Sequence, residues 1–282
     1  MVQLDGEGNK EQANIGALTI INMKDVHSKA YVLSYPLSLK SKFSHAKTED
    51  YQNCVRLAFM DFGRFKKLQV DHESVFYDNT HKTPYPTIFH LWLCGLGVEL
   101  CFTPKGNPQK QGMVERSHQT MDRQVFQGRT YKKWEEVLLK CWERRNRLNY
   151  EIPSRVLNNQ PPLKANPKAV NSGLKYTPKK EEKLFCGQRI YEYLSTCEGW
   201  CRKITKGAFY LGSIRYGTKK IKEEKEIKIR FNPLTQLFDL YDSNKILLES
   251  IKPKGLDFKH LSGNLDQFIE WEKEHRKFMP KK

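Results

Sequence analysis

The chain has 282 residues with 49 Lys and Arg against 32 Asp and Glu, which gives a net charge of +17. This length allows two domains with separate cores, and the charge favours a polyanionic partner such as nucleic acid or an acidic membrane surface. No apolar run approaches bilayer length and no secretory signal pattern is present, so we expect a soluble cytoplasmic protein. Seven cysteines at irregular positions indicate reduced intracellular thiols rather than a disulfide framework.

Three strands are predicted near the N-terminus. Residues 2–5 form a short strand that ends in an acid, Asp5. Residues 16–22 and 30–35 are rich in β-branched and aromatic side chains and are bounded by turn residues, as strands are. Asp25 is expected to cap the turn that precedes the third strand.

Helices and strands alternate over the next part of the chain. Thr48 is a favourable N-cap followed by two acids, so a helix is predicted from this residue to about Lys67. The elements predicted after it are a strand at 74–77, a helix at 88–96, a strand at 98–102 and a helix from Met113. This order is typical of a ribonuclease H-like α/β layer, here with a mixed five-stranded sheet.

Two acids are predicted to meet at one edge of this sheet. The strand at 74–77 ends at Asp78, and Glu115 lies on the helix that begins near Met113. Carboxylates that converge from separate elements supply the hard oxygen ligands of a two-metal phosphoryl-transfer site.

Three segments, 78–79, 103–109 and 111–118, resemble in order and spacing the integrase core of DDE transposases and retroviral-type integrases. They read Asp-Asn, Thr-Pro-Lys-Gly-Asn-Pro-Gln and Gln-Gly-Met-Val-Glu-Arg-Ser-His. Gln3 and Asp5 resemble the first catalytic strand of that family, so the resemblance makes Asp5 the first metal ligand, with Asp25 as the competing candidate. The resemblance covers roughly residues 1–170.

The resemblance implies a DNA transposase, most similar to those of bacterial insertion sequences, that cleaves and joins DNA ends by in-line phosphoryl transfer. Asp5, Asp78 and Glu115 would be the catalytic residues and would hold two Mg²⁺ ions, with Mn²⁺ able to substitute. The implied partners are double-stranded DNA, as element ends and as target, and further copies of the chain on that DNA, with no membrane. The implied location is the cytoplasm, in association with the nucleoid.

Two rival functions remain open from the sequence. Thr80 stands where the family usually has glycine after Asp-Asn, so the chain could be a catalytically impaired DNA-binding remnant of a transposase. It could also be a structure-specific nuclease on the same fold.

A second domain is predicted after the core. The expected organisation is a catalytic core at 1–170, a polar linker at 171–184, an SH3-like all-β barrel at 185–255 and a tail at 256–282 with a possible short helix at 265–278. The strands predicted for the barrel region are 189–194, 202–204, 208–216, 226–232, 237–241 and 246–249.

Basic and polar residues on both predicted domains are candidates for DNA contacts. In the core they are Lys105, Lys110, Arg116, Gln119 and Arg123. In the barrel they are Arg202, Lys203, Lys206, Arg215, Lys219 and Lys220.

Overall fold

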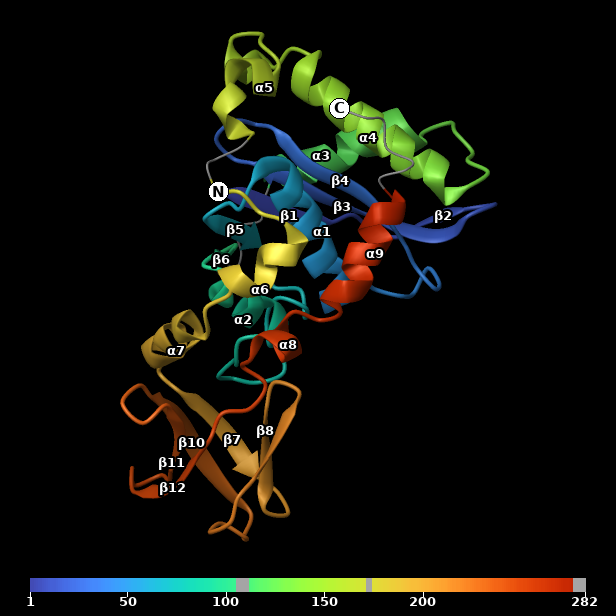
Figure 1. The fold of residues 1–282 in the computed structure, drawn as a ribbon. Coiled ribbons are helices and arrows are strands. Elements are labelled where there is room, and N and C mark those ends of the chain that lie inside the picture. Colours follow the sequence, from blue (N-terminus) through green and yellow to red (C-terminus); the bar gives the residue numbers. More distant parts are fainter. Residues whose placement is uncertain (105–111, 171–173, 276–282) are drawn as a thin grey trace. The chain divides into compact units, whose positions relative to one another are not determined.

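The structure is a computed structural model that describes residues 1–104, 112–170 and 174–275, and it divides into two compact units (Figure 1). Unit 1 comprises the described residues within 1–71, 98–181 and 264–282, and unit 2 comprises 72–97 and 182–263. The segment 72–97, which the sequence analysis assigns to the core, therefore groups with the C-terminal part of the chain. No helix in the described parts of the chain is long and apolar enough to cross a membrane.

Unit 1 is built on a mixed sheet of six strands rather than the predicted five. The strands are β1 (Val2–Gly6), β2 (Lys10–Gln12), β3 (Gly16–Asp25), β4 (Tyr31–Ser38), β5 (Lys67–Val70) and β6 (Glu99–Phe102). Their order is β2-β3-β1-β5-β6, with β4 also paired to β3. β5 runs parallel to both β1 and β6, whereas β3 is antiparallel to its neighbours. The strand missing from the prediction is β2, which has only three residues.

Helices cover both faces of this sheet (Figure 1). They are α1 (Thr48–Phe62), α3 (Gly112–Met121), α4 (Trp134–Tyr150) and α9 (Leu265–His275). Unit 1 also contains the single turn α5 (Pro162–Ala165), and it ends at Glu181, the first residue of α6 (Glu181–Leu184). On one face, Leu18 and Ile20 of β3 join a buried cluster with Met121 and Cys141 of α3 and α4. Ile21 points to the opposite face, towards α1, because neighbouring strand residues alternate.

The helix predicted from Thr48 to about Lys67 ends earlier. Gly63 has a φ of 79°, a backbone conformation that favours glycine, and its N–H bonds the carbonyl of Phe59. The chain then enters β5 at Lys67, and residues 74–77 form a turn. The prediction of a strand at 74–77 is therefore wrong. The strand that follows α1 is β5, which begins at Lys67, seven residues before the predicted start at 74 (74 − 67 = 7).

Unit 2 combines helices with antiparallel strands. Its helices are α2 (Ile88–Gly95), α7 (Gly187–Thr196) and α8 (Phe258–Leu261). Its strands are β7 (Trp200–Ile204), β8 (Ala208–Leu211), β9 (Ile214–Gly217), β10 (Lys225–Asn232), β11 (Leu237–Tyr241) and β12 (Leu247–Ile251). They form an open four-stranded sheet, β12-β11-β10-β7, and a separate hairpin of β8 and β9. Because the two sheets are open and separate within residues 182–263, the predicted closed SH3-like barrel is not confirmed.

Two predicted strands of unit 2 differ from the structure. Residues 189–194 lie in α7, where Ile190 and Leu194 are four positions apart and both fully buried, as expected for one face of a helix. Residues 208–216 form two strands that turn at Gly212, which has a φ of 57°. The predicted C-terminal helix is confirmed as α9 over the described residues.

A buried ion pair fastens two distant segments of unit 1 to α1. Arg56 and Glu181 both have side chains with no exposed area, and two hydrogen bonds of 2.9 and 2.8 Å join them. The hydroxyl of Tyr176 donates to the same carboxylate, and the Arg56 guanidinium lies 5.5 Å from the Phe268 ring of α9. The segment around Glu181 and α9 are therefore both held against α1.

Replacing Glu181 with Ala leaves the buried Arg56 guanidinium without its carboxylate counter-ion, and breaking a buried ion pair in this way typically costs about 3–5 kcal/mol of unfolding free energy. We expect a loss of this size for Glu181→Ala in urea unfolding. The neighbouring Glu182 is exposed, so Glu182→Ala should change stability by less than about 0.5 kcal/mol. Equal effects of the two variants would contradict the role assigned to the ion pair.

Candidate functional site

An acid is found at the end of each of the neighbouring parallel strands β1 and β5. Gln3 of β1 pairs with Gln69 of β5, and their side chains are hydrogen bonded at 3.2 Å, so both point to the same face. Asp5 and Asp71 each lie two residues further along the chain than this pair, and Asp71 follows Val70, the last residue of β5. If the alternation of side chains continues to Asp71, both acids are on the face of Gln3 and Gln69. Because neighbouring strands are about 4.8 Å apart, we infer that the two carboxylates lie near each other where these strands end.

Helix α3 brings a third acid to the same edge. The backbone N–H of Val114 donates to the side-chain oxygen of Gln3 at 3.2 Å, which attaches the start of the helix to β1. Glu115 is exposed, and His118 lies three residues after it on the same side of the helix. His118 Nε2 is 3.2 Å from Asp5 Oδ2. Glu115 therefore lies on the side of α3 that carries His118, the residue in contact with Asp5.

A chain of hydrogen bonds orients His118 towards Asp5. The hydroxyl of Ser34 donates to Asn22 Oδ1 at 2.6 Å, which leaves the Asn22 amide nitrogen to donate to His118 Nδ1 at 2.9 Å. In neutral His118 the proton is then on Nε2, which donates to Asp5. The sequence predicts His118 only as part of a motif, and its spacing of three residues from Glu115 is the signal for a role at the site.

Glu7 adds a further carboxylate next to Asp5. The two residues alternate with Gly6, so their side chains share a face. Lys10 Nζ lies 2.9 Å from Glu7 Oε1 and 2.6 Å from Asp122 Oδ1. Among the described residues, the buried Oε2 of Glu7 has no hydrogen-bond partner. Burial raises the pKa of Glu7, although the hydrogen bond from Lys10 opposes this change.

The donor chemistry of this edge suits a hard divalent cation. Asp5, Asp71 and Glu115 offer only carboxylate oxygens, the ligands that Mg²⁺ and Mn²⁺ prefer. The side chain of Asp5 is 24% exposed, so solvent and ions can reach it. Within residues 1–104, 112–170 and 174–275, no three His, Cys, Asp or Glu side chains are already gathered closely enough to hold an ion.

Asp78 belongs to unit 2, in a loop rather than at the end of a strand. Its carboxylate accepts hydrogen bonds from the Thr80 hydroxyl at 2.5 Å and the Tyr85 N–H at 3.2 Å, and lies 2.9 Å from His81 Nδ1. Arg202 Nη2 is 3.4 Å away. Burial raises the pKa of Asp78, but the hydrogen bonds outweigh burial and lower it to about 2. Through these hydrogen bonds the Asp78 carboxylate stabilises the conformation of its own loop.

Thr80 causes no backbone strain in that loop, because it does not have the positive φ that would require glycine. Its hydroxyl and N–H both bond to Asp78 Oδ1. Asp71 was not among the acids predicted from the sequence, although its place directly after the apolar Leu68 and Val70 is a signal for an acid at a strand end.

Asp25, the competing first ligand, has the capping role expected of it. Its Oδ2 accepts hydrogen bonds from the Ser28 N–H at 2.8 Å and the Ser28 hydroxyl at 2.7 Å. It pairs with Val2 at the start of β1, whereas Asp5 pairs with Asn22 near the end of that strand. Asp25 therefore lies next to the start of β1, whereas Asp5 lies near the other end of this strand.

The predicted DNA contacts divide into three groups. Arg202 is buried, and its guanidinium donates to the carbonyls of Thr83 at 2.9 Å and Tyr210 at 3.1 Å, so the prediction of a DNA contact is wrong for this residue. Lys105 and Lys110 lie outside the described residues. The remaining side chains are exposed: Arg116, Gln119, Arg123, Lys203, Lys206, Arg215, Lys219 and Lys220.

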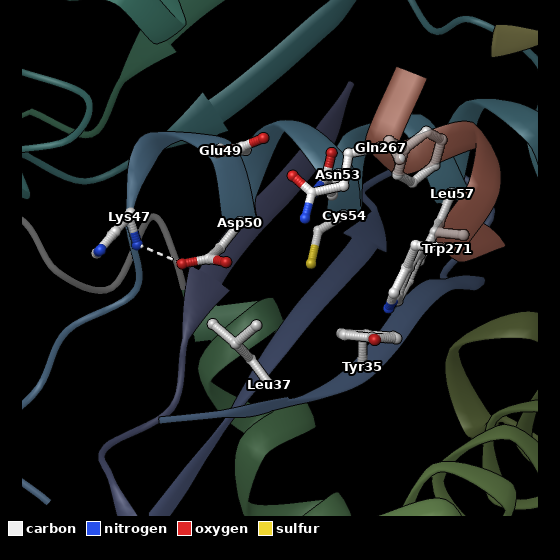
Figure 2. Close-up of a pocket in the computed structure, with 11 residues that line it drawn as sticks. Tyr35, Leu37, Lys47, Glu49, Asp50, Asn53, Cys54, Leu57, Gln267 and Trp271 are labelled. Carbon is white, nitrogen blue, oxygen red and sulfur yellow. Dashed lines mark hydrogen bonds between the residues drawn. The ribbon is translucent and has the colours of Figure 1, made fainter. Parts of the chain in front are cut away.

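A pocket of about 330 Å³ lies elsewhere in unit 1, between α1, α9 and β4 (Figure 2). Tyr35 and Trp271 line it and pack edge to face with ring centroids 5.8 Å apart. Cys54 also lines it, and burial raises the pKa of this thiol well above its usual range, so it is a poor nucleophile. The pocket does not include Asp5, Asp71 or Glu115.

No family model and no curated protein sequence matches the chain. Among solved structures, it is similar to the catalytic core domain of BIV integrase, with 16% identity, 61% of this chain and 96% of that chain covered, and a TM-score of 0.41. It is also similar to a chain of the simian T-cell lymphotropic virus intasome in complex with PP2A regulatory subunit B56 gamma. That match has 11% identity, covers 90% of this chain and 79% of that chain, and has a TM-score of 0.43.

The lowered pKa of Asp78 predicts a pH-dependent contribution to stability. The folded state binds the proton less readily than the unfolded chain, so the contribution is complete above about pH 4 and is lost as pH falls towards 2. We expect Asp78→Asn to lower the unfolding free energy by about 1.5–3 kcal/mol at pH 7, the usual range for hydrogen bonds to a charged group. The difference from the unmodified protein should shrink between pH 4 and 2 in urea unfolding.

Glu223 in the same unit is exposed, and Glu223→Gln serves as the control for removing one negative charge. It should leave stability nearly unchanged at both pH values. A penalty for Asp78→Asn that stays constant from pH 7 to pH 2 would contradict the assigned hydrogen-bonding role.

Proposed function

We propose that the chain is a metal-dependent polynucleotidyl transferase that cleaves DNA and joins DNA ends, as transposases and integrases do. The observation that carries the proposal is the parallel pairing of Gln3 in β1 with Gln69 in β5, which supports neighbouring positions for Asp5 and Asp71, two residues further along each chain segment. Glu115 on α3 completes a set of three acids on three elements. This arrangement agrees with the resemblance of the sequence to the integrase core.

In this proposal Asp5, Asp71 and Glu115 hold two Mg²⁺ ions, and Mn²⁺ can substitute for them. When bound, such ions activate the attacking oxygen and stabilise the charge that develops at phosphorus. The residues of the chain provide the positions: His118, held by Asn22, orients Asp5, and the Gln3 side chain anchors the start of α3. No nucleophilic side chain is needed, because the displacement at phosphorus is direct.

Asp71 replaces Asp78 as the second acid in this proposal. A metal ligand needs oxygen lone pairs that can turn towards the cation, and Asp78 already accepts hydrogen bonds from Thr80 and Tyr85 and pairs with His81. Asp71 lies directly after a strand that is parallel to the one carrying Asp5. Asp71 is favoured over Asp78 mainly by this position, because the carboxyl ends of adjacent parallel strands always share one edge of a sheet.

The proposed substrate is double-stranded DNA, both as element ends and as target, with several copies of the chain acting together on it. The net charge of +17 and the exposed basic side chains on both units suit a polyanion. These side chains would hold the phosphate backbone and position the ends without reading their sequence.

The comparison of two aspartates tests the assignment. We expect Asp71→Asn, like Asp5→Asn and Glu115→Gln, to reduce strand joining on a pre-cleaved duplex end by at least about 100-fold. The reason is that metal binding supplies several kcal/mol of transition-state stabilisation. Asp78→Asn should retain most of the activity at neutral pH. Gel assays with Mg²⁺ and with Mn²⁺ measure the strand-joining activity of each variant, and fluorescence polarisation measures its DNA binding.

Glu99→Gln is the matched control, since Glu99 is an exposed acid of β6 that pairs with Lys67 at 2.8 Å. It should react like the unmodified chain. Loss of activity in Asp78→Asn with retention in Asp71→Asn would reject the assignment of the second acid. An unmodified chain that neither cleaves nor joins DNA with either metal would reject the function.

DNA affinity should fall steeply with salt, because each neutralised phosphate releases counterions. We expect log Kd to vary linearly with log salt concentration, and Arg116→Gln and Lys219→Gln each to reduce the slope by about one. Lys67 lies at the start of β5, at the opposite end of the strand from Asp71, so Lys67→Gln should leave the slope unchanged. Affinity that is independent of salt would exclude nucleic acid as the main partner.

A further inference from the structure

The loop that joins β4 to α1 exposes an aromatic ring among basic residues. Phe43, at the centre of residues 39–47, has 80% of its area exposed. Lys42 Nζ lies 5.2 Å from the centre of this ring, and Lys40 and Lys47 are also exposed. An exposed aromatic ring with one lysine over it, in a loop that carries two further exposed lysines, has the chemistry of a surface that binds a nucleic-acid base and its phosphates.

The backbone of this loop is held in place on both sides of Phe43. The Asn9 side-chain nitrogen donates to the carbonyls of Lys42 and Ser44, both at 2.8 Å. Ser44 also bonds back to Ser41 through its N–H and its hydroxyl, both at 3.0 Å. The ring is thus exposed on a fixed support, and little conformational entropy would be lost when it binds a flat partner.

The far end of the loop is fixed as well. The N–H of Lys47 donates to Asp50 Oδ2 at 2.7 Å, which caps the start of α1 (Figure 2). Ala46, next to it, is buried. The loop is therefore anchored at Ala46 and Lys47 in addition to the contacts that Asn9 makes.

The loop emerges at the edge of the sheet that carries the acids. Gly6, at the end of β1, and Tyr35 of β4 both pair with Ile21 of β3, so the two strands are level there. β4 runs in the same direction as β1 and continues to Ser38 before the loop begins. Asn9 follows closely after β1, and its contacts connect the loop to the strand end that carries Asp5.

Single exposed apolar side chains are common on protein surfaces. Val156 in unit 1 and Leu234 in unit 2 are 73% and 93% exposed, but they are aliphatic and cannot offer a ring for stacking. Phe43 differs in three respects: its ring is flat, its backbone is held on both sides, and Lys42 lies over it in a loop that Asn9 connects to the end of β1.

We propose that Phe43 stacks on an unpaired base of the DNA end while the neighbouring lysines bind the adjacent phosphates. This inference rests on the proposed function, because it assigns the ring a place next to the reacting end. A phenyl ring has no hydrogen-bonding group, so it accepts any base and favours ends that are frayed or single-stranded. Phe43 is a positioning residue that keeps the reacting strand separated from its complement.

The test compares two DNA duplexes, one blunt and one with an unpaired tail carrying 2-aminopurine at the end. Binding is measured without divalent ions in the Asp71→Asn background, so that the readout does not depend on chemistry. Phe43→Ala should weaken binding to the tailed DNA by roughly 5- to 150-fold, the usual effect of losing one stacked base, and leave blunt DNA almost unaffected. Phe43→Trp should keep the tail preference and the quenching of 2-aminopurine.

Two controls and a melting curve separate stacking from other effects. Val156→Ala truncates an exposed apolar side chain of the same unit and should leave the affinities for tailed and for blunt DNA unchanged. Lys42→Gln should weaken the binding of the tailed and the blunt DNA by the same factor. If Phe43→Ala, with an unchanged melting temperature, binds tailed and blunt DNA as the parent does, or loses both equally, the stacking role is wrong. Absence of strand joining by the unmodified chain would instead reject the proposed function, whatever the tail preference.

Discussion

The parallel pairing of β1 with β5 determines where the acids of unit 1 lie. A slip of one residue in this register would move Asp71 to the opposite face of the sheet, away from Asp5. Buried amides hold the register: Gln3 bonds Gln69, and Gln69 bonds the hydroxyl of Thr103 at 3.4 Å. Because Gln3 also accepts the N–H that opens α3, one network connects the elements that carry the three acids. Buried amides left without partners would cost stability, so the same residues stabilise the fold and align the site.

The environments of Asp5 and Asp78 differ in a way that suits different tasks. Asp5 receives a hydrogen bond from His118, which orients it, and part of its side chain is open to solvent. Asp78 is surrounded by donors that stabilise its charge and close its loop. An anion that stabilises a loop has its lone pairs engaged, whereas an anion that binds a cation must keep some of them available. The same residue type therefore has a structural role in unit 2 and a proposed catalytic role in unit 1.

Unit 2 is assembled from segments more than 80 residues apart, since residues 72–97 join 182–263. Arg202 of β7 donates to the Thr83 carbonyl, and the indole N–H of Trp200 bonds the Pro84 carbonyl at 3.1 Å. Such contacts connect a loop of the first half of the chain to a strand of the second half. Neither composition nor local periodicity contains this information, which explains why a linear division into core, linker and barrel differs from the compact units.

The sequence alone determined the elements whose signals are local. The mixed α/β character, the short strand ending in Asp5, the helix that carries Glu115, the turn capped by Asp25 and the C-terminal helix all follow from periodicity, capping and turn chemistry over a few residues. Tertiary structure decided which aspartate accompanies Asp5, because strand neighbours far apart in sequence are defined only by the sheet register. It also decided that Arg202 is buried and that residues 189–194 are helical, because burial depends on which distant surfaces cover a side chain. Local patterns specify the elements, and long-range packing specifies which of their side chains meet.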